Sequence, residues 1–287
     1  MTYAVVTVVR NEEESLRRLG DCMHVQVVRP SEWIIVDDGS TDGTLAAARA
    51  LSTNYPWIRA VTAPAELAFK AGLDALEAIP EVVVVLDADI SLRADYFARL
   101  LDEFARRPRL GIASGACFEL NAGAWTRTHV AGDHVRGAAR AYRRECLEKL
   151  SPLNEQAGWD TVDEVRAAVQ GWETGIIDDL SFFHHRRPAV RDRGTNRWWA
   201  LGECSYYMRY RWPYLVLRAL HNARRDVGAL VMIPAFVGAA LHRKPRLDDE
   251  AVIRCLRAQQ RLRYLRRRAR EKSARPVEPP GRARPLS

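Results

Sequence analysis

The stretch Val82-Val83-Val84-Val85-Leu86-Asp87-Ala88-Asp89 decides the fold of this chain. Five apolar residues in a row, four of them β-branched, predict a strand buried on both faces, as in a parallel sheet. Asp87 and Asp89 follow directly, and their spacing of two places both carboxylates on one side of an extended backbone. The carboxyl end of a buried parallel strand is where open α/β sheets bind ligands.

Two unpaired carboxylates on one side would repel each other unless a cation lies between them. Magnesium is typically held by one or two carboxylates together with substrate phosphates. The alternative is a strand that runs into an acidic surface turn. The stretch alone leaves both a metal site and a turn open.

The 287 residues suffice for one large α/β domain, or for one domain with an appendage, and an apolar fraction of 47% is ample for a core. Residues 242–287 contain 15 Lys/Arg and 5 Asp/Glu, which leaves 29 Lys/Arg and 31 Asp/Glu for residues 1–241. The positive net charge therefore belongs to the C-terminal segment. Such a segment suits a polyanionic partner, either an anionic membrane surface or nucleic acid.

The five cysteines are scattered and show no metal-type spacing, so reduced thiols in a cytoplasmic compartment are expected. The chain opens directly into a strand-like run, and no signal peptide is expected.

A strand–helix–strand unit precedes the acidic pair. Tyr3–Val9 predicts a first buried strand, followed by a helix capped by Asn11 and ended by Gly20. Trp33–Val36 predicts a second buried strand, which runs into Asp-Asp-Gly-Ser-Thr-Asp-Gly-Thr at residues 37–44 and then an Ala-rich helix. Two Asp residues directly after a buried strand are more than a turn or a helix cap requires.

The pattern is a poor fit to dinucleotide binding, because no Gly-x-Gly-x-x-Gly follows the first strand and no Walker-type lysine loop is present. A bound nucleotide would instead need acidic groups for its base and ribose and a metal for its phosphates. Lys70, on a helix expected to run to about Ala78, either meets a phosphate or is a solvated helix lysine. A further strand is expected at Ile112–Phe118.

Several segments together resemble family 2 glycosyltransferases of the GT-A fold, in the order and spacing of that family. They are Ala4–Val9 with Asn11-Glu12-Glu13, Val36–Asp42, Leu86–Asp89, Gly137–Glu145, Gly158–Glu164 and Phe183–Arg186. The likeness covers roughly residues 3–190, about two-thirds of the chain. The family usually has a Pro and an aromatic just before the Asn, where this chain has Val8 and Arg10.

The resemblance implies transfer of a sugar from a nucleotide-sugar, usually with inversion. Asp38 resembles the carboxylate that contacts the nucleobase. Asp87 resembles the residue that contacts ribose or metal-bound phosphate, and Asp89 the principal ligand of a divalent cation, Mg2+ or Mn2+. The remaining residues expected at the donor nucleotide are Val8, Asn11, Glu12 and Ala88.

The acceptor hydroxyl is a weak nucleophile, and a carboxylate within reach can take its proton. Asp160, Asp163 and Glu164 lie together at the start of an expected helix, where acids also favour the helix dipole, so at least one is expected to be structural. Asp160 is the first candidate, because it lies eleven residues before Gly171, the distance at which the family's catalytic carboxylate usually precedes a helix-ending Gly. Asp163 is the second. An acceptor that is an ionised lipid phosphate would need no base.

His184 and His185 should lie on opposite faces of a strand, so only one can face the site. The resemblance implies a histidine that closes the metal and diphosphate site, and His184 is the preferred candidate. The alternative is a hydrogen-bonded structural histidine.

The C-terminal third combines aromatic, basic and apolar segments. Aromatics and Arg alternate in Tyr206–Tyr214, a pattern that suits a membrane interface but also a sugar- or RNA-binding surface. Val227–Leu241 contains no charged residue, is too short to span a bilayer straight and contains Pro234, expected to kink it. We expect this run to lie in or re-enter the cytoplasmic leaflet, beside a basic helix at Arg254–Arg270. The alternative is an ordinary core helix.

The predicted architecture is an α/β, Rossmann-like, mostly parallel GT-A sheet flanked by helices, with a C-terminal helical extension that associates with the membrane. The expected boundaries are residues 1–215 for the catalytic domain, 216–272 for the extension and 273–287 for a disordered tail. The predicted function is metal-dependent, inverting transfer from a UDP- or GDP-sugar to a saccharide or polyprenyl-linked acceptor, in polysaccharide or glycolipid biosynthesis at the inner face of the cell membrane. Alternatives are a sugar-phosphate nucleotidyltransferase, or an inactive GT-A-like binding protein whose basic tail binds nucleic acid.

Overall fold

The computed structural model describes residues 1–121, 123–128, 134–151, 158–185 and 195–261. These residues form two compact units. The first comprises the described residues up to 151 and residues 170–185, and the second comprises residues 158–169 and 195–261. Residues 158–169 thus group with the C-terminal helices. The predicted functional boundary at residue 215 stays a prediction. The basic segment beyond residue 261 and the tail from residue 273 lie outside the described residues.

The first unit is built on a nine-stranded sheet, counted over the described residues, in the order β3-β2-β1-β4-β8-β6-β9-β5, with β7 paired to β6. The strands are β1 (Tyr3–Val9), β2 (Trp33–Asp37), β3 (Ile58–Thr62), β4 (Val82–Leu86), β5 (Ile90–Leu92), β6 (Leu110–Asn121), β7 (Ala124–Arg127), β8 (Ala139–Arg143) and β9 (Glu173–His184). Strands β1 to β4 are parallel to one another, as are β6 and β9, whereas β8 is antiparallel to both of its neighbours.

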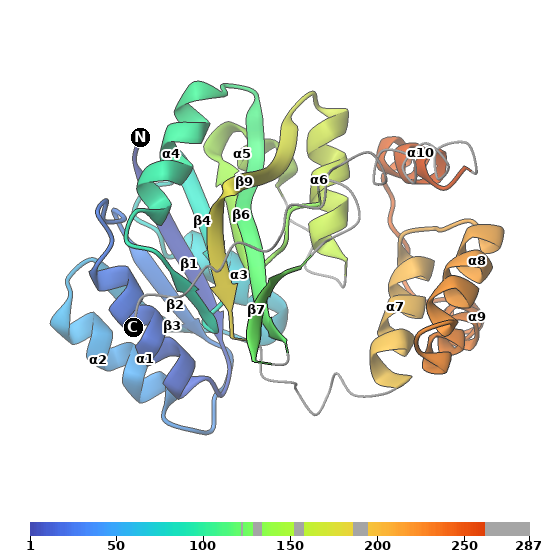
Figure 1. The fold of residues 1–287 in the computed structure, drawn as a ribbon, viewed down its shortest axis with the longest axis horizontal. Coiled ribbons are helices and arrows are strands. Elements are labelled where there is room, and N and C mark those ends of the chain that lie inside the picture. Colours follow the sequence, from blue (N-terminus) through green and yellow to red (C-terminus); the bar gives the residue numbers. More distant parts are fainter. Residues whose placement is uncertain (122, 129–133, 152–157, 186–194, 262–287) are drawn as a thin grey trace. The chain divides into compact units, whose positions relative to one another are not determined.

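Helices cover both faces of this sheet (Figure 1). They are α1 (Glu13–His24), α2 (Thr44–Asn54), the short turn η1 (Ala65–Leu67), α3 (Ala68–Asp74), α4 (Tyr96–Arg106) and α5 (Arg144–Leu150). Residues of α1, α2 and α4 share one core cluster with Val5 and Ile35. Helix α3 lies on the other face, where Gly72 packs against Val6 and Val36. The predicted α/β sheet flanked by helices is confirmed.

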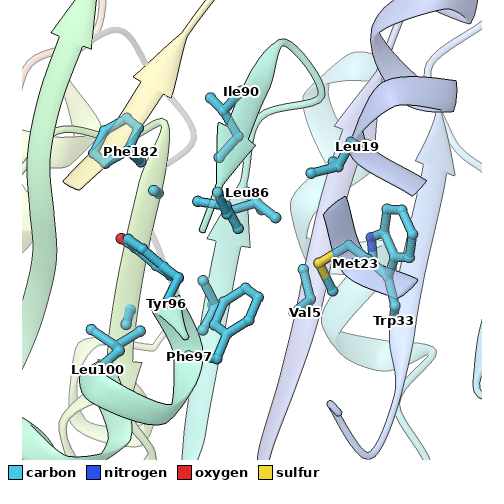
Figure 2. Close-up of a cluster of buried hydrophobic side chains, with 14 of the residues drawn as sticks. Val5, Leu19, Met23, Trp33, Leu86, Ile90, Tyr96, Phe97, Leu100 and Phe182 are labelled. Carbon is cyan, nitrogen blue, oxygen red and sulfur yellow. The ribbon is translucent and has the colours of Figure 1, made fainter. Parts of the chain in front are cut away.

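The acidic pair lies between two residues that the core fixes. Leu86 and Ile90 are both fully buried, and Figure 2 shows them among the side chains of the cluster that includes Phe97 of α4 and Phe182 of β9. Burying a Leu or Ile side chain contributes about 1.5–3 kcal/mol. Both ends of Asp87-Ala88-Asp89 are therefore fixed by packing.

Two local predictions for α1 are wrong. Asn11 does not cap the helix: Glu12 is the N-cap residue and makes no side-chain cap hydrogen bond. Asn11 instead has a φ of 55°, and its Oδ1 accepts the Thr41 backbone N–H at 2.8 Å. Gly20 does not end the helix, which continues to His24. A Cβ at Gly20 would lie 3.0 Å from Leu51 of α2, so glycine allows the two helices to approach.

The second unit consists of helices, within the part of it that the structure describes. They are α6 (Trp159–Val169), α7 (Thr195–Tyr207), α8 (Trp212–Ala223), η3 (Val227–Val231), α9 (Met232–Leu241) and α10 (Glu250–Gln259). One core cluster joins Val162 of α6, Cys204 of α7 and Ile253 of α10. A second joins Trp198 of α7 to Leu215 of α8 and Met232 of α9.

The apolar run Val227–Leu241 forms η3 followed by α9. Pro234 is the third residue of α9, within the first turn, where an amide N–H has no partner inside the helix. It therefore removes no hydrogen bond from α9, and the expected kink stays a prediction. A Cβ at Gly202 of α7 would lie 2.5 Å from the Met232 carbonyl oxygen, so one side of α9 packs closely within the unit. Among the described residues, no helix reaches the length and apolarity that crossing a membrane requires.

Candidate active site

The acidic pair is fixed to the strands on either side of it. The Asp87 backbone N–H donates to the Ala138 carbonyl at 2.8 Å, and the Asp89 carbonyl accepts the His185 N–H at 2.7 Å. Ala88 is buried, Asp87 is exposed and Asp89 is half-buried. The two carboxylates thus stand at the end of β4 with part of their surface open to solvent.

His184 is the last residue of β9, and its side chain lies next to the acidic pair. The antiparallel pairing of β5 with β9 places His184 opposite Ile90, next to Asp89. Its Nε2 lies 3.0 Å from Oδ1 of Asp89. Asp87, Asp89 and His184 each offer one ligand atom, and these atoms all lie within 4.8 Å of one another. The structure therefore brings together the three residues predicted as metal ligands, whose binding of a metal stays a prediction.

The pKa shifts of His184 and Glu12 indicate an excess of negative charge around Asp87 and Asp89. Burial alone would lower the pKa of His184, but its hydrogen bond to Asp89, the nearby Cys117 thiol and the charges of Asp89 and Asp87 outweigh burial and raise the pKa to about 10. Burial raises the pKa of Glu12 to about 7, with a further contribution from the charges of Asp89 and Asp87. A bound cation would neutralise part of the negative charge of Asp87 and Asp89 that causes these shifts.

The donor set fits a divalent cation. Two carboxylates are ligands that Mg2+ and Mn2+ prefer, and an imidazole nitrogen is a common ligand of transition metals. The exposure of Asp87 leaves room for solvent or substrate oxygens, which such a cation retains among its ligands.

His185 lies on the other face of β9, as the alternation of the strand predicts. Its Nε2 lies 2.7 Å from the Ser91 hydroxyl, and its ring packs edge-on against Trp125 at a centroid separation of 5.1 Å. Burial lowers its pKa, and the positive charge of Arg18 contributes in the same direction. His185 is therefore held by contacts within the protein, and the choice of His184 for the site stays a prediction.

The three carboxylates of the acidic turn after β2 make different contacts. Asp37 is buried, and its Oδ2 accepts the Ser40 N–H at 3.1 Å. Asp42 accepts the Thr44 N–H at 2.9 Å, which bonds the turn to the start of α2. Asp38 is partly exposed and lies 3.6 Å from the Arg10 guanidinium. Asp37 and Asp42 thus have structural roles in the turn, and the contact of Asp38 with a nucleobase stays a prediction.

Three further residues lie beside His184 that the sequence analysis did not single out. Cys117 and Glu119 of β6, together with His184, offer ligand atoms within 4.8 Å of one another, and Arg136 contacts both Cys117 and Glu119. The predicted strand stopped at Phe118, one residue before Glu119. Alternation would place Cys117 and Glu119 on one face, but only the pairing of β6 with β9 identifies that face as the one containing His184.

A family model named Glycosyl transferase family 2 matches residues 4–151, which include the acidic turn and the acidic pair. The chain belongs to this family. The match confirms the resemblance noted from the sequence motifs, and it makes the protein a glycosyltransferase.

Solved structures share the fold of this glycosyltransferase at low sequence identity. The mannosyltransferase PcManGT from Pyrobaculum calidifontis, in complex with GDP-Man and Mn2+, is 19% identical with a TM-score of 0.58, over 95% of this chain and 87% of that one. TarS 1–349 of S. aureus, in complex with UDP, is 14% identical with a TM-score of 0.53, over 72% and 65% of the two chains. GalNAc-T7 with UDP, GalNAc and Mn2+ is 12% identical with a TM-score of 0.59, over 85% and 55%.

The other residues predicted at the donor nucleotide lie at several places in the first unit of the glycosyltransferase. Val8 is partly exposed near the end of β1, and Glu12 lies close enough to the acidic pair to be affected by its charge. Lys70 lies exposed on α3 and forms an ion pair with Asp74, one helical turn away. The phosphate contact of Lys70 stays a prediction.

The two base candidates lie on α6, in the second unit. Asp160 is half-buried in the first turn, where its Oδ1 accepts the Thr161 N–H at 2.8 Å. Asp163 is fully buried. The helix ends at Val169, and Gly171 has a φ of 86°, which fits the helix-ending glycine used in the sequence argument. The catalytic role of either residue stays a prediction.

Proposed function

We propose that this glycosyltransferase transfers a sugar, with inversion, from a UDP- or GDP-sugar to a saccharide or polyprenyl-linked acceptor in polysaccharide or glycolipid biosynthesis. The observation that supports it best is the convergence of Asp87, Asp89 and His184 at the end of β4. Solved structures with a similar fold contain GDP-Man or UDP-GlcNAc, which supports a nucleotide-sugar as the donor.

Each residue has a defined part in this proposal. Asp87, Asp89 and His184 would hold the cation, and the imidazole favours Mn2+ over Mg2+. A divalent cation, when bound, stabilises the negative charge that develops on the diphosphate leaving group. Asp38, with Asn11 and Glu12 on the neighbouring loop, would bind the nucleoside. The alternative of a sugar-phosphate nucleotidyltransferase is disfavoured, because residues 4–151 match the glycosyltransferase family.

The proposed base is Asp160. Proton transfer requires a carboxylate that can reach the acceptor hydroxyl. Asp160 retains exposed surface, whereas Asp163 has none, and buried carboxylates are usually occupied by partners within the protein. This difference favours Asp160 over Asp163.

A panel of UDP- and GDP-sugars tests the proposed donor class. One nucleotide should raise the unfolding temperature with Mn2+ present and much less with EDTA, because Asp89 would hold the cation that the diphosphate needs. At 100 times the dissociation constant, ligand binding stabilises a folded protein by about 2.7 kcal/mol. Slow Mn2+-dependent hydrolysis of the same donor should accompany it. Equal stabilisation by the donor with and without metal would contradict the proposed role of the cation.

We further propose that the second unit contacts the inner face of the cell membrane. One side of the η3–α9 segment packs within the unit, but Val227 and Leu241 are 73% and 77% exposed. The exposed residues Arg224 and Arg225 precede this segment and Arg243 follows it. Apolar insertion combined with basic residues is the two-signal arrangement that stable peripheral attachment requires.

Sedimentation with anionic liposomes tests the membrane proposal on the full chain. The unaltered protein should pellet, and salt should weaken the binding without eliminating it, because only the electrostatic part is screened. The double variant Val227→Ser/Leu241→Ser should reduce the bound fraction several-fold. A matched control is Val25→Ser/Val27→Ser, which alters two exposed valines of the first unit and should bind like the unaltered chain. Binding of RNA with a steep salt dependence, but not of liposomes, would identify a nucleic-acid surface instead.

A further inference from the structure

We infer that Glu119 is a positioning residue for His184: its carboxylate accepts a hydrogen bond from Nδ1–H of the ring, so that Nε2, after losing its proton to solvent, is the nitrogen that would hold the cation. The inference rests on the proposed metal site. It concerns a residue outside the acidic pair and outside the short segments that carry the family resemblance in the sequence analysis, although within the matched residues 4–151.

The geometry places the imidazole between two carboxylates. Nε2 lies 3.0 Å from Oδ1 of Asp89, whereas Nδ1 lies 3.7 Å from Oε1 of Glu119. Nδ1 is buried and makes no hydrogen bond in the structure, and a hydrogen bond of about 2.9 Å would require it to approach Oε1 of Glu119 by about 0.8 Å. His184 is almost completely buried, so water is a poor substitute for either partner.

The position of Glu119 is itself fixed. The parallel pairing of β6 with β9 places Glu119 beside His184. Arg136, which immediately precedes the β8 region, donates from its guanidinium to Oε1 of Glu119. Only about a quarter of each of these two side chains is exposed. Arg136 therefore holds the same carboxylate oxygen, Oε1, that lies nearest to Nδ1 of the imidazole.

The neighbouring thiol suggests two other interpretations, which the geometry disfavours. Cys117, Glu119 and His184 could together bind a thiophilic cation. Arg136, however, lies 3.6 Å from Sγ of Cys117 and also contacts Glu119, so a positive charge already occupies that side. The thiol could also accept Nδ1–H, but sulfur is a weak acceptor and a carboxylate a strong one.

A carboxylate behind a ligating histidine has two physical effects. It fixes the tautomer, because Nδ1 must carry the proton to donate, and it makes Nε2 a stronger donor to the metal. Loss of such a partner typically costs 10–100-fold in metal affinity. The expected phenotype of a Glu119 variant is therefore weaker metal binding, with nucleotide affinity in EDTA unchanged.

Three variants separate charge from shape in a calorimetric titration of Mn2+ into protein saturated with UDP or GDP, whichever the donor screen selects. Glu119→Gln keeps the size of the side chain and removes its charge, and should lower Mn2+ affinity 10–100-fold. Glu119→Asp keeps the charge and should retain more affinity than Glu119→Gln. A purely structural role, which depends on side-chain size, predicts the reverse order. Cys117→Ala should bind Mn2+ like the unaltered protein.

Ring 15N spectra of the Mg2+- and nucleotide-bound protein provide a second readout. His184, identified by the signal that His184→Gln lacks, should carry its proton on Nδ1 in the unaltered protein and lose that preference in Glu119→Gln. The matched control is Glu103→Gln, which removes a charge that also pairs with an arginine, Arg106 on α4. Unchanged affinity in Glu119→Gln, or loss of affinity in Cys117→Ala alone, would overturn the inference. If the unaltered protein binds no Mn2+, the proposed metal site fails and the inference fails with it.

Discussion

Asp89→Ala should abolish the metal-dependent part of donor binding and leave the fold intact. Asp89 provides the carboxylate nearest to His184 and shares with Asp87 the end of β4, so its loss leaves one carboxylate and one imidazole. The strand itself should persist, because Leu86 and Ile90 anchor the segment in the core and the Asp89 backbone carbonyl still accepts the His185 N–H. Calorimetric titration of the nucleotide with Mn2+ should show a loss of more than about 100-fold, above that expected for an outer-shell residue.

The matched control is Asp102→Ala on α4. Asp102 is exposed and contacts only Arg106 at 3.8 Å among the ion pairs of the described residues. Its removal should change the unfolding temperature little, because exposed pairs of this kind contribute about 0–1 kcal/mol. Donor binding by Asp89→Ala that equals that of Asp102→Ala in the presence of Mn2+ would contradict the metal site. A loss of the same size in EDTA would mean that the substitution disturbs the nucleotide loops rather than a cation.

The sequence predicted the acidic centre because its signals are local. The run Val82–Leu86, with four β-branched residues, predicts a buried strand, and the spacing of Asp87 and Asp89 then places them on one side. Alternation also predicted that His184 and His185 point to opposite faces. Which of them faces the acidic pair depends on the register of β9 against β5, in which Ile90 pairs with His184. Register between strands that are distant in sequence follows from packing, and neither strand shows it alone.

The residues that the sequence analysis missed depend on the same kind of information. Glu119 lies beside His184 because β9 pairs with β6, a parallel pairing between strands about 60 residues apart, and Arg136 joins them through its contact with Glu119. In the sequence Glu119 reads as an exposed acid beyond the end of a strand. Asn11 was expected to cap a helix, but its positive φ turns the side chain to the Thr41 backbone of another loop. The preference of Asn for helix N-caps suggested a local role, but in the structure Asn11 instead accepts a hydrogen bond from a distant part of the chain.

The apolar run Val227–Leu241 shows a different limit. Fifteen residues without charge fit a membrane segment and a core helix equally well, since hydropathy does not reveal the packing partner. The close approach of Gly202 to Met232 accounts for one side of α9, and the exposed Val227 and Leu241 leave the membrane proposal to experiment.

Asp160→Asn should lower the turnover number by about 10²–10⁴-fold, the usual contribution of a general base. Donor affinity should change little, because a group that takes a proton acts in the transition state and not in donor binding. The substitution is conservative in the structure: an Asn at this position keeps Oδ1, which can still accept the Thr161 N–H. Steady-state rates with a hydroxyl acceptor, combined with calorimetric donor affinity, separate the two effects. Asp248→Asn is the matched control, since Asp248 is an exposed residue of the same unit.

Asp163→Asn distinguishes the two candidates on α6. Asp163 is fully buried, so its substitution should act first on stability and lower the unfolding temperature, with a smaller effect on turnover of the folded fraction. If Asp163→Asn abolishes turnover at full stability while Asp160→Asn remains active, the base is Asp163 and the argument from spacing to Gly171 is wrong. If both variants remain active, the acceptor needs no deprotonation, and an ionised phosphate on a lipid becomes the better assignment, because its oxygen is already a competent nucleophile at neutral pH.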